Sequence, residues 1–176
     1  MPQKIEADNL SVIVNDINSS GVHANKIAFF TSVKPKFSDR LGAEFGIRLN
    51  YYAADSKAVS YLDYEPRIMF NYLLKQDLSF FASYTRQNQY INLITASTVG
   101  IPTDFWIAAS EGIPRQSSNN YSVGCNKIIS KQISTCLNGY FRSMNNLIEY
   151  PYGLTQFNET TTLKNDILIG NGEAYG

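Results

Sequence analysis

The stretch LGAEFGIRLNYY, residues 41–52, alternates strictly between two sets of side chains. One face carries Leu41, Ala43, Phe45, Ile47, Leu49 and Tyr51, and the other carries Gly42, Glu44, Gly46, Arg48, Asn50 and Tyr52. A period of two is typical of a β-strand with one apolar and one polar face. Such a strand fits a sheet that borders a protein core, and it fits equally a sheet that borders a lipid bilayer.

The same alternation predicts strands along most of the chain. It is weak over residues 24–34, clear over 59–72 and 78–87, and visible over 121–128 and 132–144, with a last strand beginning near Ile167. No helical period extends over a useful length, and no run approaches the roughly 20 apolar residues of a membrane-spanning helix. The sequence therefore predicts an all-β, antiparallel, up-and-down sheet of about six or seven strands.

The predicted connections alternate in length. KPKFSDR, LLKQD and IISKQ are short and partly charged, whereas AADSKA and two much longer loops, near 88–118 and 145–166, lie between them. Long structureless loops are uncommon in compact soluble domains. Outer-membrane barrels combine short periplasmic turns with long external loops. Strands of 10 to 14 residues also suit a tilted bilayer crossing, so the pattern favours a transmembrane β-barrel segment.

The composition of the polar faces indicates the same class. Charged residues make up 17% of the chain, below the average of about 25% for soluble domains. The polar positions hold small or amide side chains: Gly42, Gly46, Asn50, Ser79, Ser83, Ser122, Gly124 and Asn126. A solvated sheet would favour Lys and Glu there, whereas a barrel lumen holds residues of this kind. Fifteen basic residues balance fifteen acidic ones, so no nucleic-acid partner is expected.

A series of motifs, in order, resembles the barrel of Bacteroidetes TonB-dependent outer-membrane receptors over residues 24–176. The motifs are YEPRIMFNYLLKQDLSFFASYTRQNQYINLI, GIPTDFWIAAS, GYFRSMNNLIEY and GNGEAYG. The resemblance implies a 22-stranded barrel, an N-terminal plug and a TonB box. It implies import of a siderophore, glycan, peptide or vitamin across the outer membrane of a Gram-negative cell. The implied partners are outer-membrane lipid, the TonB complex through a missing N-terminal part, and a surface lipoprotein.

Residues 1–176 are expected to form one partial barrel region. Residues 1–23 are predicted to be a leading loop or an incomplete strand, and MPQKIEADNL lacks the apolar core of a secretory signal. Seven strands are fewer than the eight that close a bacterial barrel, and no plug or TonB box is recognised, so an incomplete barrel is expected. The first predicted strand contains IAFFTSV, which has no charge to protect an exposed edge. The alternative is a soluble β-sandwich or small-barrel ligand-binding module.

Charged residues on two neighbouring strands predict ion pairs on the lumen side. The candidates are Glu44, Arg48, Asp63, Glu65 and Arg67. If the strands pair with residue 52 near residue 59, Arg48 faces Asp63 and Glu44 faces Arg67, which stabilises the register by about 0.2–1 kcal/mol per pair. Asp63 and Glu65 could instead be the paired carboxylates of a hydrolase, but their neighbour Arg67 favours a structural cluster.

Little in the sequence suggests catalysis. His23 is the only histidine, and no phosphate-binding loop, nucleophile elbow or HExxH motif is present. We therefore expect no enzyme activity, no catalytic residue, no cofactor and no metal site. Cys125 and Cys136 lie close in sequence but belong to opposite faces of their strands, so two free cysteines are expected rather than a disulfide.

The loop between residues 87 and 119 contains candidates for ligand contact. They are Tyr90, Asp104, Phe105 and Trp106. Aromatic side chains on an external loop can stack on a sugar or on a chelate. The competing interpretation, which the sequence favours, is that they pack the loop or join the aromatic girdle at the membrane surface.

Overall fold

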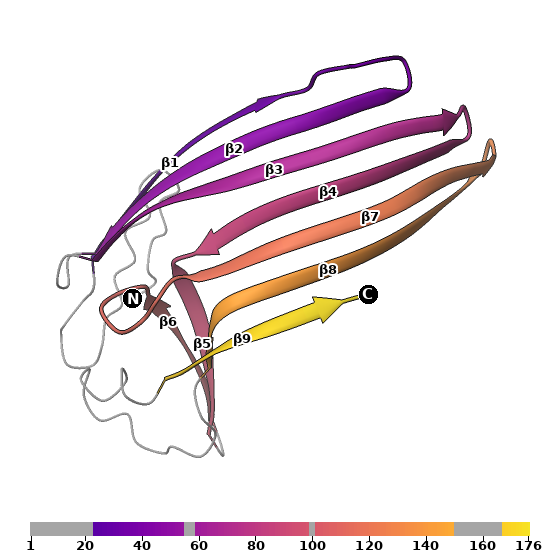
Figure 1. Cartoon of the computed structure of the whole chain (residues 1–176). Helices are drawn as coiled ribbons and strands as arrows, with labels where there is room; N and C mark the ends of the chain where they lie inside the picture. The colour runs from indigo at the N-terminus through magenta and orange to yellow at the C-terminus, as the bar shows by residue number, and fades with distance from the viewer. Residues whose placement is uncertain (1–22, 55–58, 99–100, 150–166) are drawn as a thin grey trace.

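The computed structural model describes residues 23–54, 59–98, 101–149 and 167–176. Within these ranges the chain forms nine strands and no helix. They are β1 (Ala24–Val33), β2 (Leu41–Ala54), β3 (Val59–Lys75), β4 (Leu78–Gln89), β5 (Ile91–Thr98), β6 (Ile101–Ala108), β7 (Gln116–Ser130), β8 (Ile133–Glu149) and β9 (Leu168–Tyr175). Seven strands form one antiparallel sheet in the order β1-β2-β3-β4-β7-β8-β9, and β5 pairs with β6 (Figure 1). The prediction of an all-β antiparallel sheet with about seven strands is confirmed.

In the described part of the chain, no helix has the length and apolar character that crossing a membrane would require.

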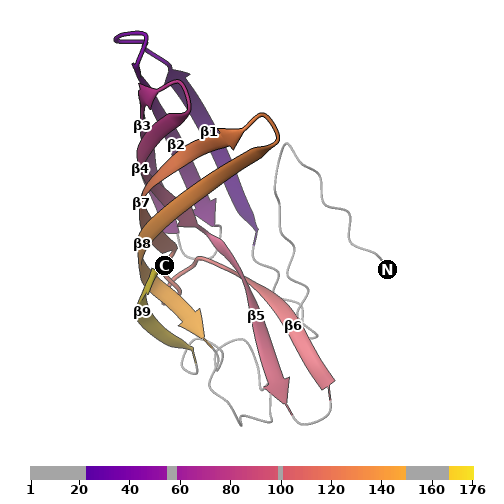
Figure 2. The same ribbon diagram turned by 90° about the vertical axis from the view of Figure 1, so that its right-hand side faces the viewer.

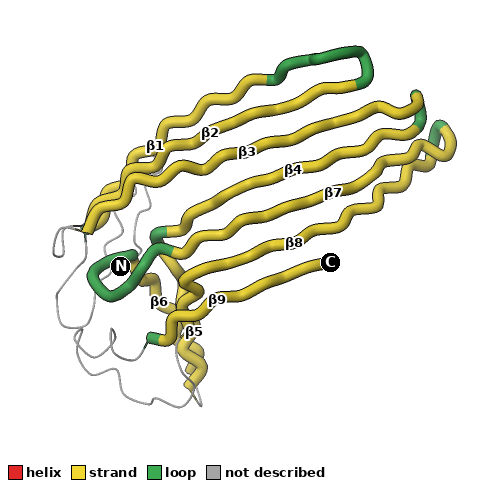
Figure 3. Tube along the Cα trace, in the orientation of Figure 1, coloured by secondary structure: helices red, strands yellow, loops and turns green. Residues whose placement is uncertain are grey.

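The connections of the sheet differ between its two ends. At one end residues 34–40, 76–77 and 131–132 join β1 to β2, β3 to β4 and β7 to β8 (Figure 3). At the opposite end the chain passes from β2 to β3, from β4 to β7 and from β8 to β9. The predicted alternation in connection length is therefore only partial, because residues 55–58 between β2 and β3 are fewer than residues 34–40 between β1 and β2. The content of the longest predicted connection also differs from the prediction.

The predicted loop over residues 88–118 is wrong as a structureless segment. Strand β4 continues to Gln89, β5 and β6 form a hairpin, and β7 already begins at Gln116. The hairpin extends away from the seven-stranded sheet (Figure 2), and its Ile94 packs with Ile113 and Ile167. This apolar cluster packs the segment into an ordered unit. The length of the predicted loop over residues 88–118 is therefore no argument against a soluble domain. Of the other predicted loop, residues 145–149 belong to β8, and 150–166 lie outside the described residues.

The two faces of the sheet have opposite chemistry. We name as the apolar face the positions of Ile27, Phe29, Phe45, Ile47, Leu49, Leu62, Tyr64, Phe70, Phe80, Tyr121, Val123 and Leu137, which lie side by side across the strands. We name as the polar face the positions of Lys26, Arg48, Asn50, Tyr52, Asp63, Glu65, Arg67, Asn120, Ser122 and Arg142.

Burial on these faces is reversed relative to an ordinary soluble sheet. Leu62 is 77% exposed and Leu137 72% exposed on the apolar face. On the polar face Asn50 is 0% exposed, and both Asp63 and Glu65 are buried. The predicted separation of Ile47 and Leu49 from Arg48 is confirmed, since they point to opposite faces of β2.

The predicted register between β2 and β3 is wrong by two residues. Arg48 lies opposite Glu65 rather than Asp63, and Arg67 lies opposite Gly46 rather than Glu44. A shift of two keeps every side chain on its face, so the alternation could not detect it. The observed register adds the pairs Ala53–Ser60 and Ala54–Val59 to the ladder and sets Tyr52 opposite Tyr61. The observed register still sets Arg48 opposite an acidic side chain, that of Glu65, so charge complementarity alone does not distinguish the two registers.

Pro66 marks the point where β3 and β4 separate. The ladder between them ends at Arg67–Thr85, although β2 pairs with β3 through Ile47–Pro66 and beyond. The next pair would require a backbone N–H from residue 66, which proline lacks. Beyond this point β4 keeps its pairing with β7 and diverges from β3 (Figure 1).

The two cysteines are free, as predicted. Cys125 lies opposite Leu137 on the apolar face, and Cys136 lies opposite Asn126 on the other face.

Candidate functional site

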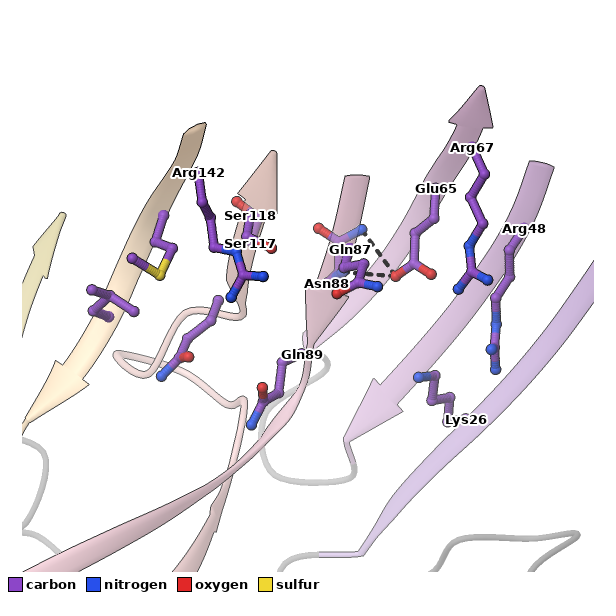
Figure 4. Close-up of a pocket in the computed structure, with 13 residues that line it drawn as sticks. Lys26, Arg48, Glu65, Arg67, Gln87, Asn88, Gln89, Ser117, Ser118 and Arg142 are labelled. Atoms are coloured by element: carbon purple, nitrogen blue, oxygen red, sulfur yellow. Dashed lines mark hydrogen bonds between the residues drawn. The ribbon is translucent and has the colours of Figure 1, made fainter. Parts of the chain in front are cut away.

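A hollow of about 370 Å³ lies on the polar face, beside the place where β3 and β4 separate. It is lined by Lys26, Arg48, Glu65, Arg67, Gln87, Asn88, Gln89, Gln116, Ser117, Ser118, Arg142, Met144 and Leu147 (Figure 4). These residues come from β1, β2, β3, β4, β7 and β8, so the register of most of the sheet determines the shape of the hollow. We refer to it as the polar-face hollow.

The lining of the polar-face hollow is strongly basic. Four of these residues are cations, namely Lys26, Arg48, Arg67 and Arg142, and Glu65 is the one carboxylate among them. Within the described residues, none of the four cations forms an ion pair with a carboxylate. The hollow therefore carries an excess of positive charge, which attracts anions.

Glu65 is committed to a structural contact. Its Oε1 accepts hydrogen bonds from the backbone N–H of Asn88 at 2.7 Å and from Asn88 Nδ2 at 3.4 Å (Figure 4). This contact lies just beyond Pro66, where the β3–β4 ladder has ended. The side chain of Glu65 thus satisfies a backbone donor that has no partner strand on that side.

The predicted ion pairs among the five lumen candidates do not form. Glu44 pairs instead with Lys34, at 3.2 Å between Oε2 and Nζ, and both side chains are partly exposed. Arg48 donates from Nε to Asn50 Oδ1 at 3.1 Å. The register shift explains the difference, because it removes both predicted charge pairs from opposite positions.

Asp63 is the centre of a second, buried cluster at the end of the sheet. Its Oδ2 accepts a hydrogen bond from the Tyr90 hydroxyl at 2.7 Å and lies 2.6 Å from Arg115 Nε. The Arg115 guanidinium also lies over the Tyr61 ring, 4.8 Å from its centroid. Tyr90 stacks on Tyr52, with ring centroids 4.7 Å apart. This cluster fastens the chain on either side of the β5–β6 hairpin to β2 and β3.

The environment of Tyr90 perturbs its ionisation. Burial, and then the hydrogen bond to Asp63 and the negative charge of that carboxylate, raise the pKa of Tyr90 well above the usual value of tyrosine. The hydroxyl therefore remains a hydrogen-bond donor throughout the physiological pH range.

The structure separates the four predicted ligand-contact residues. The side chain of Tyr90 is 2% exposed and belongs to the buried cluster, so in this structure it packs the junction rather than facing solvent. Trp106 lies on β6 and is 52% exposed. Asp104 and Phe105 pair through their backbones with Thr95 and Ile94 of β5. Neither Tyr90 nor Trp106 lines the polar-face hollow.

Sequence reasoning missed most of the residues that form the hollow. Lys26 and Arg142 have the same parity as the polar positions of their strands, so the alternation could have placed both on the polar face. Arg115 gave no such signal, since it precedes β7 and reaches Asp63 from 52 positions further along the chain.

The described residues can also be examined for a metal site and for a pair of catalytic carboxylates. No three His, Cys, Asp or Glu side chains in the described ranges come together as a set that could hold a metal ion. Asp63 and Glu65 already have protein partners and point to separate contacts. The lining of the polar-face hollow is thus basic and carries amide and hydroxyl groups.

Comparison of the chain with models of protein families, with curated proteins and with solved structures finds no significant match.

Proposed function

We propose that this chain forms part of the wall of a transmembrane β-barrel in the outer membrane of a Gram-negative cell. In this proposal the barrel belongs to a TonB-dependent receptor that imports a siderophore, glycan, peptide or vitamin. The observation that carries the proposal is the exposed apolar face, which continues across the seven-stranded sheet. A lipid bilayer is the environment that such a face matches, since its neighbours would be acyl chains.

The height of the apolar face agrees with a bilayer. On β3 the alternating apolar positions run from Leu62 to Tyr72. At about 3.3 Å per residue these ten steps cover roughly 33 Å along the strand. A strand tilt of about 40° reduces this length to roughly 25 Å, the height of the apolar band of outer-membrane barrels.

The other features of the sheet support the same proposal. The polar face would line the lumen, which in such barrels is polar. Among the described strands, β1 and β9 each lack a neighbour on one side, and in a barrel these edges pair with further strands. The assignment to TonB-dependent receptors is supported by the sequence resemblance over residues 24–176.

Single-cysteine labelling of the full-length gene product in outer membranes tests the barrel. In a background carrying Cys125→Ser and Cys136→Ser, Ile47→Cys and Arg48→Cys place a thiol on opposite faces of β2. A water-soluble maleimide should label position 48 from the lumen and leave position 47 unreacted until the membrane is dissolved in detergent and the protein is denatured. Labelling at 47 but not at 48 would reverse the assignment.

The alternative, a soluble ligand-binding module, predicts different behaviour. Such a protein would purify without detergent as a monodisperse monomer with a sharp cooperative melting transition. A receptor should instead be found in the outer-membrane fraction, and deletion of its gene should abolish uptake of one nutrient.

A further inference from the structure

The polar-face hollow brings together cations that the fold does not neutralise. Arg48 and Arg67 enter it from neighbouring strands, Lys26 from β1, and Arg142 from β8 (Figure 4). Holding four like charges around one hollow is unfavourable unless an anion or solvent screens them. The single carboxylate of the lining, Glu65, has its Oε1 engaged by Asn88. Glu65 offsets one of the four positive charges, so the hollow keeps an excess of positive charge that favours an anionic partner.

The remaining lining provides groups that bind hydroxyls. Gln87, Gln89 and Gln116 carry amides that both donate and accept hydrogen bonds, and Ser117 and Ser118 carry hydroxyls. Asn88 adds a more specific signal. Its side chain is nine-tenths buried, and its Oδ1 has no hydrogen-bond partner among the described residues. A buried acceptor without a partner costs free energy, which a donor on a ligand would recover.

We propose that the polar-face hollow binds a small anion that also carries hydroxyl groups, of the class of hydroxycarboxylates and acidic or phosphorylated sugars. Its volume of about 370 Å³ lies in the range of small-molecule sites. The cations hold the acidic groups of the ligand, and the amides and Asn88 hold its hydroxyls. That this anion is the imported cargo rests on the proposed function. The binding of the anion itself rests on the hollow alone.

Calorimetric titration of the detergent-purified full-length gene product tests the proposal. The probes are citrate, glucuronate, inorganic phosphate and glucose. Citrate or glucuronate should bind, with an affinity that falls as salt increases, and glucose should not bind. Arg67→Gln and Arg142→Gln should each raise the Kd by about tenfold or more, because each removes charge-assisted hydrogen bonds. Arg40→Gln is the matched control, since Arg40 is exposed in the turn before β2 and does not line the hollow.

Three results would overturn the anion site, and a fourth would overturn its requirement for hydroxyl groups. The first is that glucose binds as tightly as glucuronate. The second is that the Kd for glucuronate is the same in Arg67→Gln as in Arg40→Gln. The third is that none of the probes binds; a lower melting temperature of Arg67→Gln would then indicate that acidic groups of the same protein neutralise the hollow. Inorganic phosphate binding as tightly as glucuronate would overturn the requirement for hydroxyl groups.

The labelling experiment on β2 separates this proposal from the proposed function. If position 47 is protected by lipid and no anion binds, the barrel stands and the anion site fails. If citrate binds through Arg67 and Arg142 in a protein that is soluble without detergent, the anion site stands and the receptor fails.

Discussion

Tyr90 is a residue whose contacts determine how the β5–β6 hairpin joins the sheet. Its ring stacks on Tyr52, and its hydroxyl donates to Asp63, which also faces Arg115. The side chain therefore combines apolar burial with a charge-assisted hydrogen bond. Tyr52 strengthens the same junction, because its hydroxyl donates to the carbonyl oxygen of Ala109 at 2.8 Å.

Tyr90→Phe should lower the free energy of unfolding by about 1.5–3 kcal/mol, since it removes a hydrogen bond to a buried carboxylate and keeps the ring. Urea titration of the full-length gene product measures this loss. Tyr64→Phe on the exposed apolar face is the control and should change the free energy by less than about 0.5 kcal/mol.

The effect of Tyr90→Phe should also depend on pH. The pKa of Tyr90 is raised in the fold, so its stabilising contribution is complete below the unfolded value of about 10 and is lost as pH rises through the folded value. The difference between wild type and variant should thus be constant near neutral pH and shrink above about pH 10. A difference that grows in alkali would contradict the assigned direction.

Gly124 is required by close packing on the polar side of β7. A Cβ at this position would lie 2.5 Å from the Leu137 carbonyl oxygen and 2.6 Å from the Phe81 ring. Gly124→Ala should therefore destabilise the sheet by about 1–3 kcal/mol, because backbone and ring must both move. Gly42→Ala is the matched control, since an added Cβ there has no neighbour within 4 Å. Equal unfolding free energies for the two variants would show that β8 and β4 adapt without cost.

At the scale of the strands, the alternation predicted the faces but not the register. Every apolar position of β2 from Phe45 to Tyr51 lies on the expected face. The pairing with β3 was predicted from two charge pairs, and a two-residue shift preserves all faces while changing every partner. Asp63 finds its partners in Tyr90 and Arg115, which come from segments that local sequence reasoning could not connect to it.

The β5–β6 hairpin was missed for a different reason. Its strands INLITAST and IPTDFWIA flank Val99 and Gly100, a separation that suits a hairpin, but Pro102 and the mixed polarity obscured the pattern. Packing of Ile94 with Ile113 and Ile167, far apart in sequence, supports the hairpin. Contacts of this kind are decided by tertiary structure rather than by local periodicity.

Glu65 and Pro66 act together at the end of the β3–β4 ladder. Glu65→Ala should leave the buried N–H of Asn88 without an acceptor and cost about 1–3 kcal/mol of unfolding free energy. Hydrogen exchange at the Asn88 amide should accelerate in the same variant. Glu65→Gln retains an oxygen acceptor and should recover much of the loss.

Glu44→Ala is the matched control, because it removes a carboxylate from the neighbouring strand β2. It removes an exposed ion pair with Lys34 and should change the free energy by less than about 1 kcal/mol. Slow exchange at Asn88 in Glu65→Ala would show that another group satisfies this amide.

At the scale of the whole molecule, the sheet has an exposed apolar face, and among the described strands β1 and β9 each have an edge without a neighbour. The first of these edges, β1, carries exposed apolar side chains on both faces, including Phe29 and Phe30. Edges of this kind readily pair with other strands, and no charge lies within IAFFTSV to prevent it. In the proposed barrel, neighbouring strands and lipid would cover these surfaces.

Residues 1–176 expressed alone in aqueous buffer should therefore form edge-to-edge oligomers or aggregates. Phe30→Lys places a charge on β1 at the free edge and should reduce the oligomer size measured by light scattering. Met69→Lys is the control, because it adds the same charge to β3 inside the sheet, where both neighbouring strands are already paired. Detergent should dissociate contacts between apolar faces, whereas Phe30→Lys should weaken contacts between edges. The two effects on oligomer size should therefore add. A monodisperse wild-type monomer without detergent would contradict both this prediction and the barrel, because the apolar face would then be stable in water.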